Sequence, residues 1–133
     1  MSAMRFAPKT LGRLGERRAT WFYWLRGYSI VARNVRLRDG EIDLVARRGR
    51  TLVIAEVKTR QTHVAGDGHE AVGGAKRERM LALGLRYAAR DPEARLRFDV
   101  LSLYWTGWRF VVTHYADALQ PVADARRPWL WRA

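Results

Sequence analysis

The spacing of apolar positions changes along the chain, and these changes predict its elements. Between residues 10 and 26, apolar side chains recur at about the spacing of one helical face, which predicts a helix. Thr10 can cap the start of this helix, and Gly27 can end it. We expect four of its side chains to face the core: Leu11, Leu14, Phe22 and Leu25.

A second helix is predicted between residues 68 and 90, after a loop-like segment at residues 61–68. Asp67 and Glu70 resemble a capping box at its start, and Asp91-Pro92 stops it. Its apolar stripe consists of Val72, Met80, Leu83 and Tyr87, with Lys76 in the same row.

Segments rich in β-branched and aromatic residues predict five strands, at residues 28–32, 41–46, 51–58, 98–105 and 109–114. Residues 33–39 are interpreted as a basic connection, and turns are expected at residues 39–40, 47–50 and 106–107. The order helix, strand, hairpin, helix, hairpin indicates a mixed α/β domain of about five strands over residues 1–120. Residues 121–133 form a basic tail with Trp129 and Trp131.

The high net positive charge of the chain indicates what kind of partner it binds. Lys and Arg number 25 against 13 Asp and Glu, which gives a net charge of +12 and a pI near 11.3. A domain this basic is typical of proteins that bind a polyanion, and nucleic acid is the polyanion we expect. Arginine, whose planar fork suits phosphate, is the dominant basic residue. A merely soluble basic surface and a coding bias toward arginine remain alternatives.

Other features narrow the function classes. No apolar run approaches the ~20 residues that span a bilayer, and the N-terminus lacks the apolar core of a secretion signal, so we expect a cytoplasmic protein without a membrane partner. The chain contains no cysteine, which excludes disulfides and cysteine-based zinc sites. The spacing of His63, His69 and His114 fits no metal site, and we interpret them as ordinary polar or surface residues.

Three ionisable residues interrupt the predicted hairpin at residues 41–58. Glu56 and Lys58 follow a purely apolar run on one strand, and Asp43 lies between Ile42 and Leu44 on the other. Because side chains alternate faces along a strand, Glu56 and Lys58 share one face. A loop of two or four residues centred on residues 48–49 would place Asp43 on that face, opposite Ile54 and diagonal to Glu56, with Cβ atoms roughly 7 Å apart. A loop of three or five residues would send Asp43 to the other face.

This trio has the composition of a metal-dependent phosphodiesterase site. Two carboxylates can share Mg²⁺ or Mn²⁺, which activates water and polarises a phosphate, and a nearby ammonium stabilises negative charge. The alternative is an ion pair between Glu56 and Lys58, with Asp43 ending a strand. The spacing alone favours neither interpretation.

The surrounding motifs add a family resemblance. Asp43 followed by Glu56-Val57-Lys58 is similar to the signature of the restriction-endonuclease-like, or PD-(D/E)xK, nuclease superfamily. The order of motifs resembles the YraN-like (UPF0102) family of small bacterial proteins, related to archaeal Holliday-junction resolvases. The motifs in question are Gly12-x-x-Gly15-Glu16-x-x-Ala19, Gly27-Tyr28, Ala32-Arg33-Asn34, Gly40-Glu41-Ile42-Asp43-Leu44, Glu56-Val57-Lys58-x-Arg60, Lys76 and Arg97-Phe98-Asp99.

The resemblance implies a restriction-endonuclease-like fold, with a central mixed sheet flanked by helices. It also implies a Mg²⁺ or Mn²⁺ site of Asp43 and Glu56 assisted by Lys58, to which Glu16 of the first helix would add a further acid. Lys76 would reach a phosphate; a surface lysine and a solvated glutamate are the plain alternatives for Lys76 and Glu16. Residues 63–66 depart from the family pattern, so substrate details do not transfer.

The expected substrate is DNA. We assign phosphate contacts to Arg33, Arg36, Arg60 and Lys76, which predicts recognition of shape and backbone rather than base sequence. The first hypothesis is an endonuclease that hydrolyses DNA phosphodiesters, including those of branched structures, and cutting two strands of a junction would suit a homodimer. The second is a catalytically silent DNA- or RNA-binding module on the same fold. A third is an RNA- or ribosome-associated basic protein in which the trio is structural.

Overall fold

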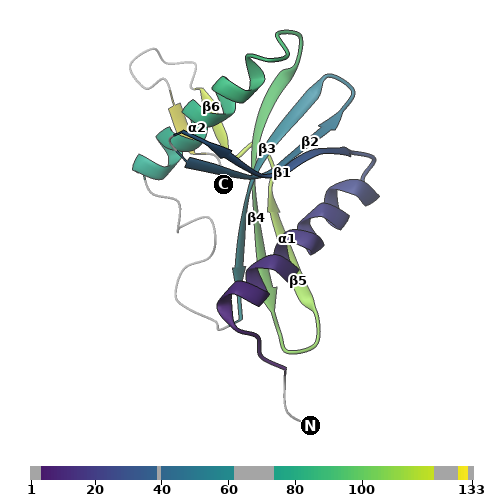
Figure 1. Ribbon diagram of the computed structural model, residues 1–133. Helices are drawn as coiled ribbons and strands as arrows, with labels where there is room; N and C mark the ends of the chain where they lie inside the picture. Colours follow the sequence, from purple (N-terminus) through teal and green to yellow (C-terminus); the bar gives the residue numbers. More distant parts are fainter. Residues whose placement is uncertain (1–3, 39, 62–73, 122–128, 132–133) are drawn as a thin grey trace.

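A five-stranded mixed sheet forms the centre of the molecule (Figure 1). The computed structural model describes residues 4–38, 40–61, 74–121 and 129–131. The strands β1 (Ser29–Leu37), β2 (Gly40–Arg48), β3 (Thr51–Arg60), β4 (Arg95–Trp105) and β5 (Phe110–Tyr115) lie side by side in chain order. Only β3 and β4 are parallel, and helix α2 (Gly74–Ala88) lies between them in the chain. The predicted mixed α/β fold is confirmed.

Helix α1 (Pro8–Leu25) and helix α2 cover opposite faces of the sheet (Figure 1). Alternation along β3 shows this division: Val53 and Ala55 pack in the cluster beneath α1, whereas Leu52 and Ile54 pack beneath α2. This double coverage explains why residues 52–55 are apolar without interruption, since both faces of the strand are buried.

The face of α1 that meets the sheet differs in part from the prediction. Leu11 and Phe22 are buried as expected, but Leu25 is 64% exposed, and the expectation that it faces the core was wrong. Tyr23 and Ala19 are fully buried instead. The reason is a close approach at Gly15, where a Cβ atom would lie 2.1 Å from the Thr59 hydroxyl oxygen of β3. The small residues of α1 therefore define its contact with the sheet.

Two other boundaries differ from the prediction, and the start of α2 is untested. Helix α1 begins at Pro8 with Ala7 at its N-cap, so Thr10 lies inside the helix and does not cap it. The segment interpreted as a basic connection, residues 33–39, belongs to β1 as far as Leu37, and its apolar residues Val35 and Leu37 pack against the α2 cluster. For α2, the predicted start near residue 68 and Val72 lie outside the described residues, while Met80 and Leu83 are buried as predicted. The turn expected at residues 106–107 joins β4 to β5.

The C-terminal residues contribute a second, small sheet. Strand β6 (Leu119–Pro121) pairs antiparallel with β7 (Trp129–Trp131). The division into a domain of residues 1–120 and a tail stays a prediction. Within the part of the chain that the structure describes, neither helix is both long and apolar enough to cross a bilayer.

Candidate active site

The β2–β3 hairpin determines how Asp43 lies relative to Glu56. Arg48 pairs with Thr51 and Val45 with Ile54, so the turn has two residues and contains Gly49 at a φ of 61°. This is the even length that the sequence argument required. The turn is centred one residue later than expected, which corrects the predicted pairing of Asp43 with Ile54. Continued by one position, the register sets Asp43 directly across from Glu56.

The carboxyl groups of Asp43 and Glu56 are in contact. Hydrogen bonding with Glu56 is one of the causes that raise the pKa of Asp43, since such a bond favours the protonated acid. Oδ2 of Asp43 also accepts a hydrogen bond from the backbone N–H of Val57 at 2.9 Å. Nζ of Lys58 lies 3.5 Å from Oε1 of Glu56. The structure thus brings Asp43, Glu56 and Lys58 together.

The surroundings of Asp43 disfavour its ionised form. Burial, followed by the negative charge of Glu56, raises the pKa of Asp43 to about 7, and the Val57 N–H opposes the shift only in part. The charge of Glu16 raises it further. Glu56 itself is only 8% exposed. A half-buried acid and a buried acid therefore lie side by side with one ammonium beside them, and a divalent cation would offset their repulsion.

A cavity of about 210 Å³ opens onto this pair. Its lining comes from β2, β3 and α2 and consists of Gly40, Glu41, Asp43, Glu56, Arg79, Met80 and Leu83. Arg79 is a cation that the sequence argument missed. Its signal was present, because Arg79 lies three residues after Lys76 and therefore on the same side of α2.

Glu16 lies on the α1 side of the structure. It lines a cavity with Arg13, Arg17, Arg33 and Asn34, and another one beside Val57 and Arg60. Its charge acts on Asp43, but it does not line the cavity at the carboxylate pair. The structure places it next to the trio rather than in it.

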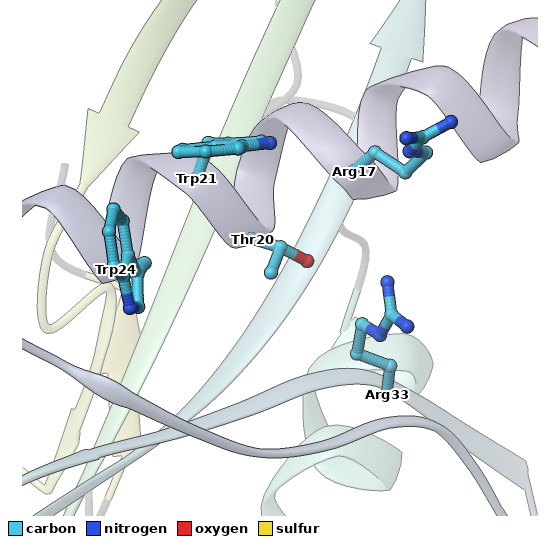
Figure 2. A pocket seen from close by; sticks show the side chains of 5 residues that line it. All are labelled: Arg17, Thr20, Trp21, Trp24 and Arg33. Atoms are coloured by element: carbon cyan, nitrogen blue, oxygen red, sulfur yellow. The ribbon is translucent and has the colours of Figure 1, made fainter.

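The predicted phosphate contacts are dispersed. Arg33 extends from β1 toward Arg17 of α1 (Figure 2), and Arg60 ends β3. Arg36 is exposed on β1, in register with Glu41. Lys76 belongs to α2, but the structure describes only its backbone and not its side chain. Arg33 and Arg60 are therefore predicted phosphate contacts that each share a cavity with Glu16.

The residues that could hold a cation are Asp43 and Glu56. No group of three or more His, Cys, Asp or Glu side chains suited to a metal occurs within residues 4–38, 40–61, 74–121 and 129–131. Mg²⁺ is commonly held by one or two carboxylates, with substrate phosphates and water completing its octahedron. The pair of acids fits such a cation, since their repulsion is the feature that positive charge would offset.

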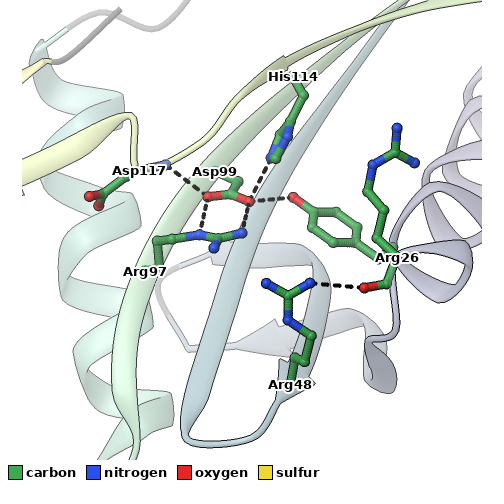
Figure 3. A network of polar contacts seen from close by, with 7 residues as sticks. Arg26, Arg48, Arg97, Asp99, His114 and Asp117 are labelled. Atoms are coloured by element: carbon green, nitrogen blue, oxygen red, sulfur yellow. Dashed lines mark hydrogen bonds and ion pairs between the residues drawn. The ribbon is translucent and has the colours of Figure 1, made fainter.

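A second buried acid, Asp99 of β4, has a different environment (Figure 3). Oδ2 accepts a hydrogen bond from the Tyr23 hydroxyl at 2.7 Å and lies 2.8 Å from Nε2 of His114. Arg97 donates from Nε and from a terminal nitrogen at 2.9 and 2.8 Å, and the backbone N–H of Asp117 donates at 2.9 Å.

Asp99 is stabilised as a carboxylate. Burial alone would raise its pKa, but hydrogen bonds from His114, Arg97, Asp117 and Tyr23 lower it to about 2. Asp99 also helps to raise the pKa of the buried Tyr23 hydroxyl, after burial itself. This network ties α1 to β4 and β5, so it holds the fold together, and His114 has a structural partner within it.

Comparison with known proteins gives the relatives of the chain. A sequence model described as "Uncharacterised protein family UPF0102" matches residues 15–103. A UPF0102 protein of Parafrankia sp. (strain EAN1pec) is 51% identical over 96 residues, which cover 71% of this chain and 81% of the relative. A UPF0102 protein of Geobacter metallireducens is 38% identical over 119 residues, which cover 88% and 98% of the two chains. The matched segment runs from α1 through most of β4 and includes the whole hairpin site.

Proposed function

The chain belongs to protein family UPF0102, and we propose that it is a nuclease that hydrolyses DNA phosphodiester bonds with a divalent cation at Asp43 and Glu56. The observation that carries this proposal is the juxtaposition of these two acids in one cavity, with Lys58 beside Glu56. As part of the same proposal, we place the family in the PD-(D/E)xK nuclease superfamily, near the archaeal Holliday-junction resolvases.

Each residue has a part in the proposed reaction. Asp43, held by the Val57 N–H, and Glu56 offer oxygen ligands that face one cavity. The cation, Mg²⁺ or Mn²⁺, would lower the pKa of a bound water and polarise the phosphate. Lys58 stabilises the charge that develops on the phosphate oxygens or orients the attacking water. Arg79 lines the same cavity and can bind a neighbouring phosphate of the strand.

Glu16 and the basic residues extend the site. Glu16 adds negative charge near Asp43 and can anchor water that belongs to the cation. Arg33, Arg36, Arg60 and Lys76 remain the proposed phosphate contacts around it. Cleavage of both strands at a branched structure needs two such sites, which a homodimer with twofold symmetry would supply.

The test is cleavage by purified protein. Linear duplex, single-stranded and four-way-junction DNA are incubated with Mg²⁺ or Mn²⁺, and with EDTA as the metal-free arm. Asp43→Asn, Glu56→Gln and Lys58→Met should each abolish cleavage. Glu93→Gln is the matched control, because Glu93 is an exposed acid in the connection from α2 to β4. Equal activity of the wild type and Asp43→Asn would overturn the proposal and would identify a contaminating nuclease.

A second candidate function is a nucleic-acid-binding module without turnover. It is favoured by one observation: the acids in the described part of the chain form a pair and not a larger ligand group. It predicts DNA or RNA binding that weakens steeply with salt, with no cleavage under any cation. The cleavage assay decides between the two candidates, since binding is expected in both.

A further inference from the structure

Two tryptophans of α1 are exposed where a protein of this size would be expected to bury them. Trp21 is 54% exposed and Trp24 is 57% exposed, and their rings meet edge to face at a centroid distance of 5.3 Å. They are three residues apart and therefore lie on one side of the helix. This spacing of Trp21 and Trp24 is visible in the sequence, although neither residue was among those predicted to face the core.

These tryptophans line a cavity of about 340 Å³ between α1 and β1, which we call the indole pocket. Its lining consists of Arg17, Thr20, Trp21, Trp24 and Arg33. Figure 2 shows the two indoles at one end of this group and the two guanidinium groups at the other, with Thr20 between them. Flat aromatic surface and paired positive charge thus meet in one cavity.

The indole pocket adjoins a second cavity that Glu16 lines. Arg17 and Arg33 also line the neighbouring cavity, of about 490 Å³, together with Arg13, Glu16 and Asn34. Glu16 in turn is near enough to Asp43 for its charge to affect the pKa of that group. A strand whose phosphates pass Arg17 and Arg33 would therefore reach the cavity of Glu16.

We propose that the indole pocket binds an unpaired nucleotide of a DNA strand, with the base against the indoles and the phosphate between Arg17 and Arg33. Every base presents a π-face that stacks on aromatic side chains, and only an unpaired base can leave its duplex for such a surface. Arginine forks bind phosphate bidentately. The net charge of +12 complements a polyanion such as a nucleic-acid strand.

The binding of an unpaired nucleotide does not depend on the proposed function, but its consequence for cleavage rests on that proposed function. If the chain is a nuclease, its substrate has an unpaired nucleotide next to the cut, so single-stranded or branched DNA is cleaved in preference to perfect duplex. If it does not cleave, the indole pocket still binds single strands.

Binding is measured by fluorescence polarisation in EDTA, which separates it from cleavage. The probes are a labelled single-stranded oligonucleotide, a blunt duplex of the same length and an abasic strand that retains the phosphates. We expect Trp24→Ala to weaken single-strand binding about tenfold and to change duplex or abasic binding little. Trp24→Phe should recover most of the loss, and Arg33→Gln should weaken binding to all strands that contain phosphate.

The matched control is Trp108→Ala, because Trp108 is 60% exposed in the turn between β4 and β5, outside the indole pocket. Circular dichroism confirms that each variant is folded. Equal single-strand affinity of the wild type, Trp24→Ala and Trp108→Ala would overturn the proposal. So would a Trp24→Ala defect confined to binding of anionic phosphatidylglycerol vesicles, which would identify a membrane surface as the partner. If the wild-type protein binds single strands through the indole pocket but cleaves no DNA, the proposed nuclease activity is refuted and the proposed binding site is not.

Discussion

The carboxyl groups of Asp43 and Asp99 lie in the same sheet and have opposite environments. Asp99 is fully buried and receives hydrogen bonds from Tyr23, Arg97 and the Asp117 backbone, with His114 at contact distance. Asp43 is partly buried, receives one backbone hydrogen bond, and faces a second acid. The pKa is lowered to about 2 in the first case and raised to about 7 in the second.

This difference separates a structural acid from a functional one. The hydrogen bonds of Asp99 satisfy its charge within the protein, so it stabilises the fold and leaves little capacity for a ligand. Asp43 has a second acid beside it and its pKa is raised, so the Asp43–Glu56 pair would be stabilised by an added positive charge. Burial alone does not distinguish the two; their partners do.

Removal of Asp43 charge gives the largest expected effect. Asp43→Asn should lower the cleavage rate roughly a thousandfold, about 4 kcal/mol of transition-state stabilisation, because one cation ligand loses its charge. Gel-based cleavage of junction and single-stranded DNA measures it. Asp99→Asn serves as the comparison and should retain cleavage at a temperature where it is folded. A larger loss of cleavage in Asp99→Asn than in Asp43→Asn would indicate that Asp99 is the functional acid and Asp43 the structural one.

The second effect concerns stability. Asp99→Asn should lower the free energy of unfolding at pH 7 by about 3 kcal/mol, since Arg97 loses its charged partner and an amide N–H faces other donors. Denaturant unfolding measures it. The folded-state pKa of Asp99 is depressed, so its contribution is present above the unfolded pKa and is lost as the pH falls from about 4 toward 2. The difference from wild type should therefore shrink in acid; a pH-independent difference would show that the packing of Asp99, and not its charge, matters.

The pH dependence of cleavage is the third test. A proton on Asp43, whose pKa is about 7, competes with the cation, so the rate at limiting Mg²⁺ should rise about tenfold per pH unit below pH ~7 and level off above it. Rates between pH 5.5 and 8.5, measured at low and saturating Mg²⁺, test this. Saturating Mg²⁺ should move the rise to lower pH. An identical profile at both concentrations would contradict competition between proton and cation at this pair.

The smallest effect is a gain in stability. The folded-state pKa of Asp43 is raised, so the folded protein loses stability as the pH rises from about 4 through about 7. Asp43→Asn removes this repulsion and should raise the Tm by a few degrees at pH 8 in EDTA, with no change at pH 4. Added Mg²⁺ should raise the Tm of wild type and not that of the variant. A destabilised Asp43→Asn at pH 8 would indicate that Asp43, like Asp99, is structural.

The local pattern of residues was sufficient to predict most helices and strands. It also predicted that Asp43 and Glu56 lie on the same side of the hairpin. Strand alternation and an even turn were enough to place Asp43 on the side of Glu56, because both depend on a short stretch of chain. The turn itself was misplaced by one residue, since Arg47 and Arg48 are equally acceptable in a strand and in a turn. Leu25 was assigned to the core because periodicity gives a stripe but not the depth at which small residues such as Gly15 allow the helix to approach.

Contacts between distant segments were beyond the sequence argument. Tyr23, Arg97 and His114 meet at Asp99 from three elements, and nothing in their spacing predicts this. The local spacing of Arg79 and of the two tryptophans was visible, but the cavities that they line also depend on residues from other elements.

The sequence by itself determined the mixed α/β fold, the family, the basic character and the presence of three ionisable residues in one hairpin. These features are properties of short segments or of total composition. Only the tertiary structure decided that the pKa of Asp99 is lowered and that of Asp43 is raised, because the free energy of a charge in the protein depends on the groups that surround it. Asp43 and Asp99 each follow an apolar residue in a strand, and the fold alone gives one of them four partners and the other a second acid.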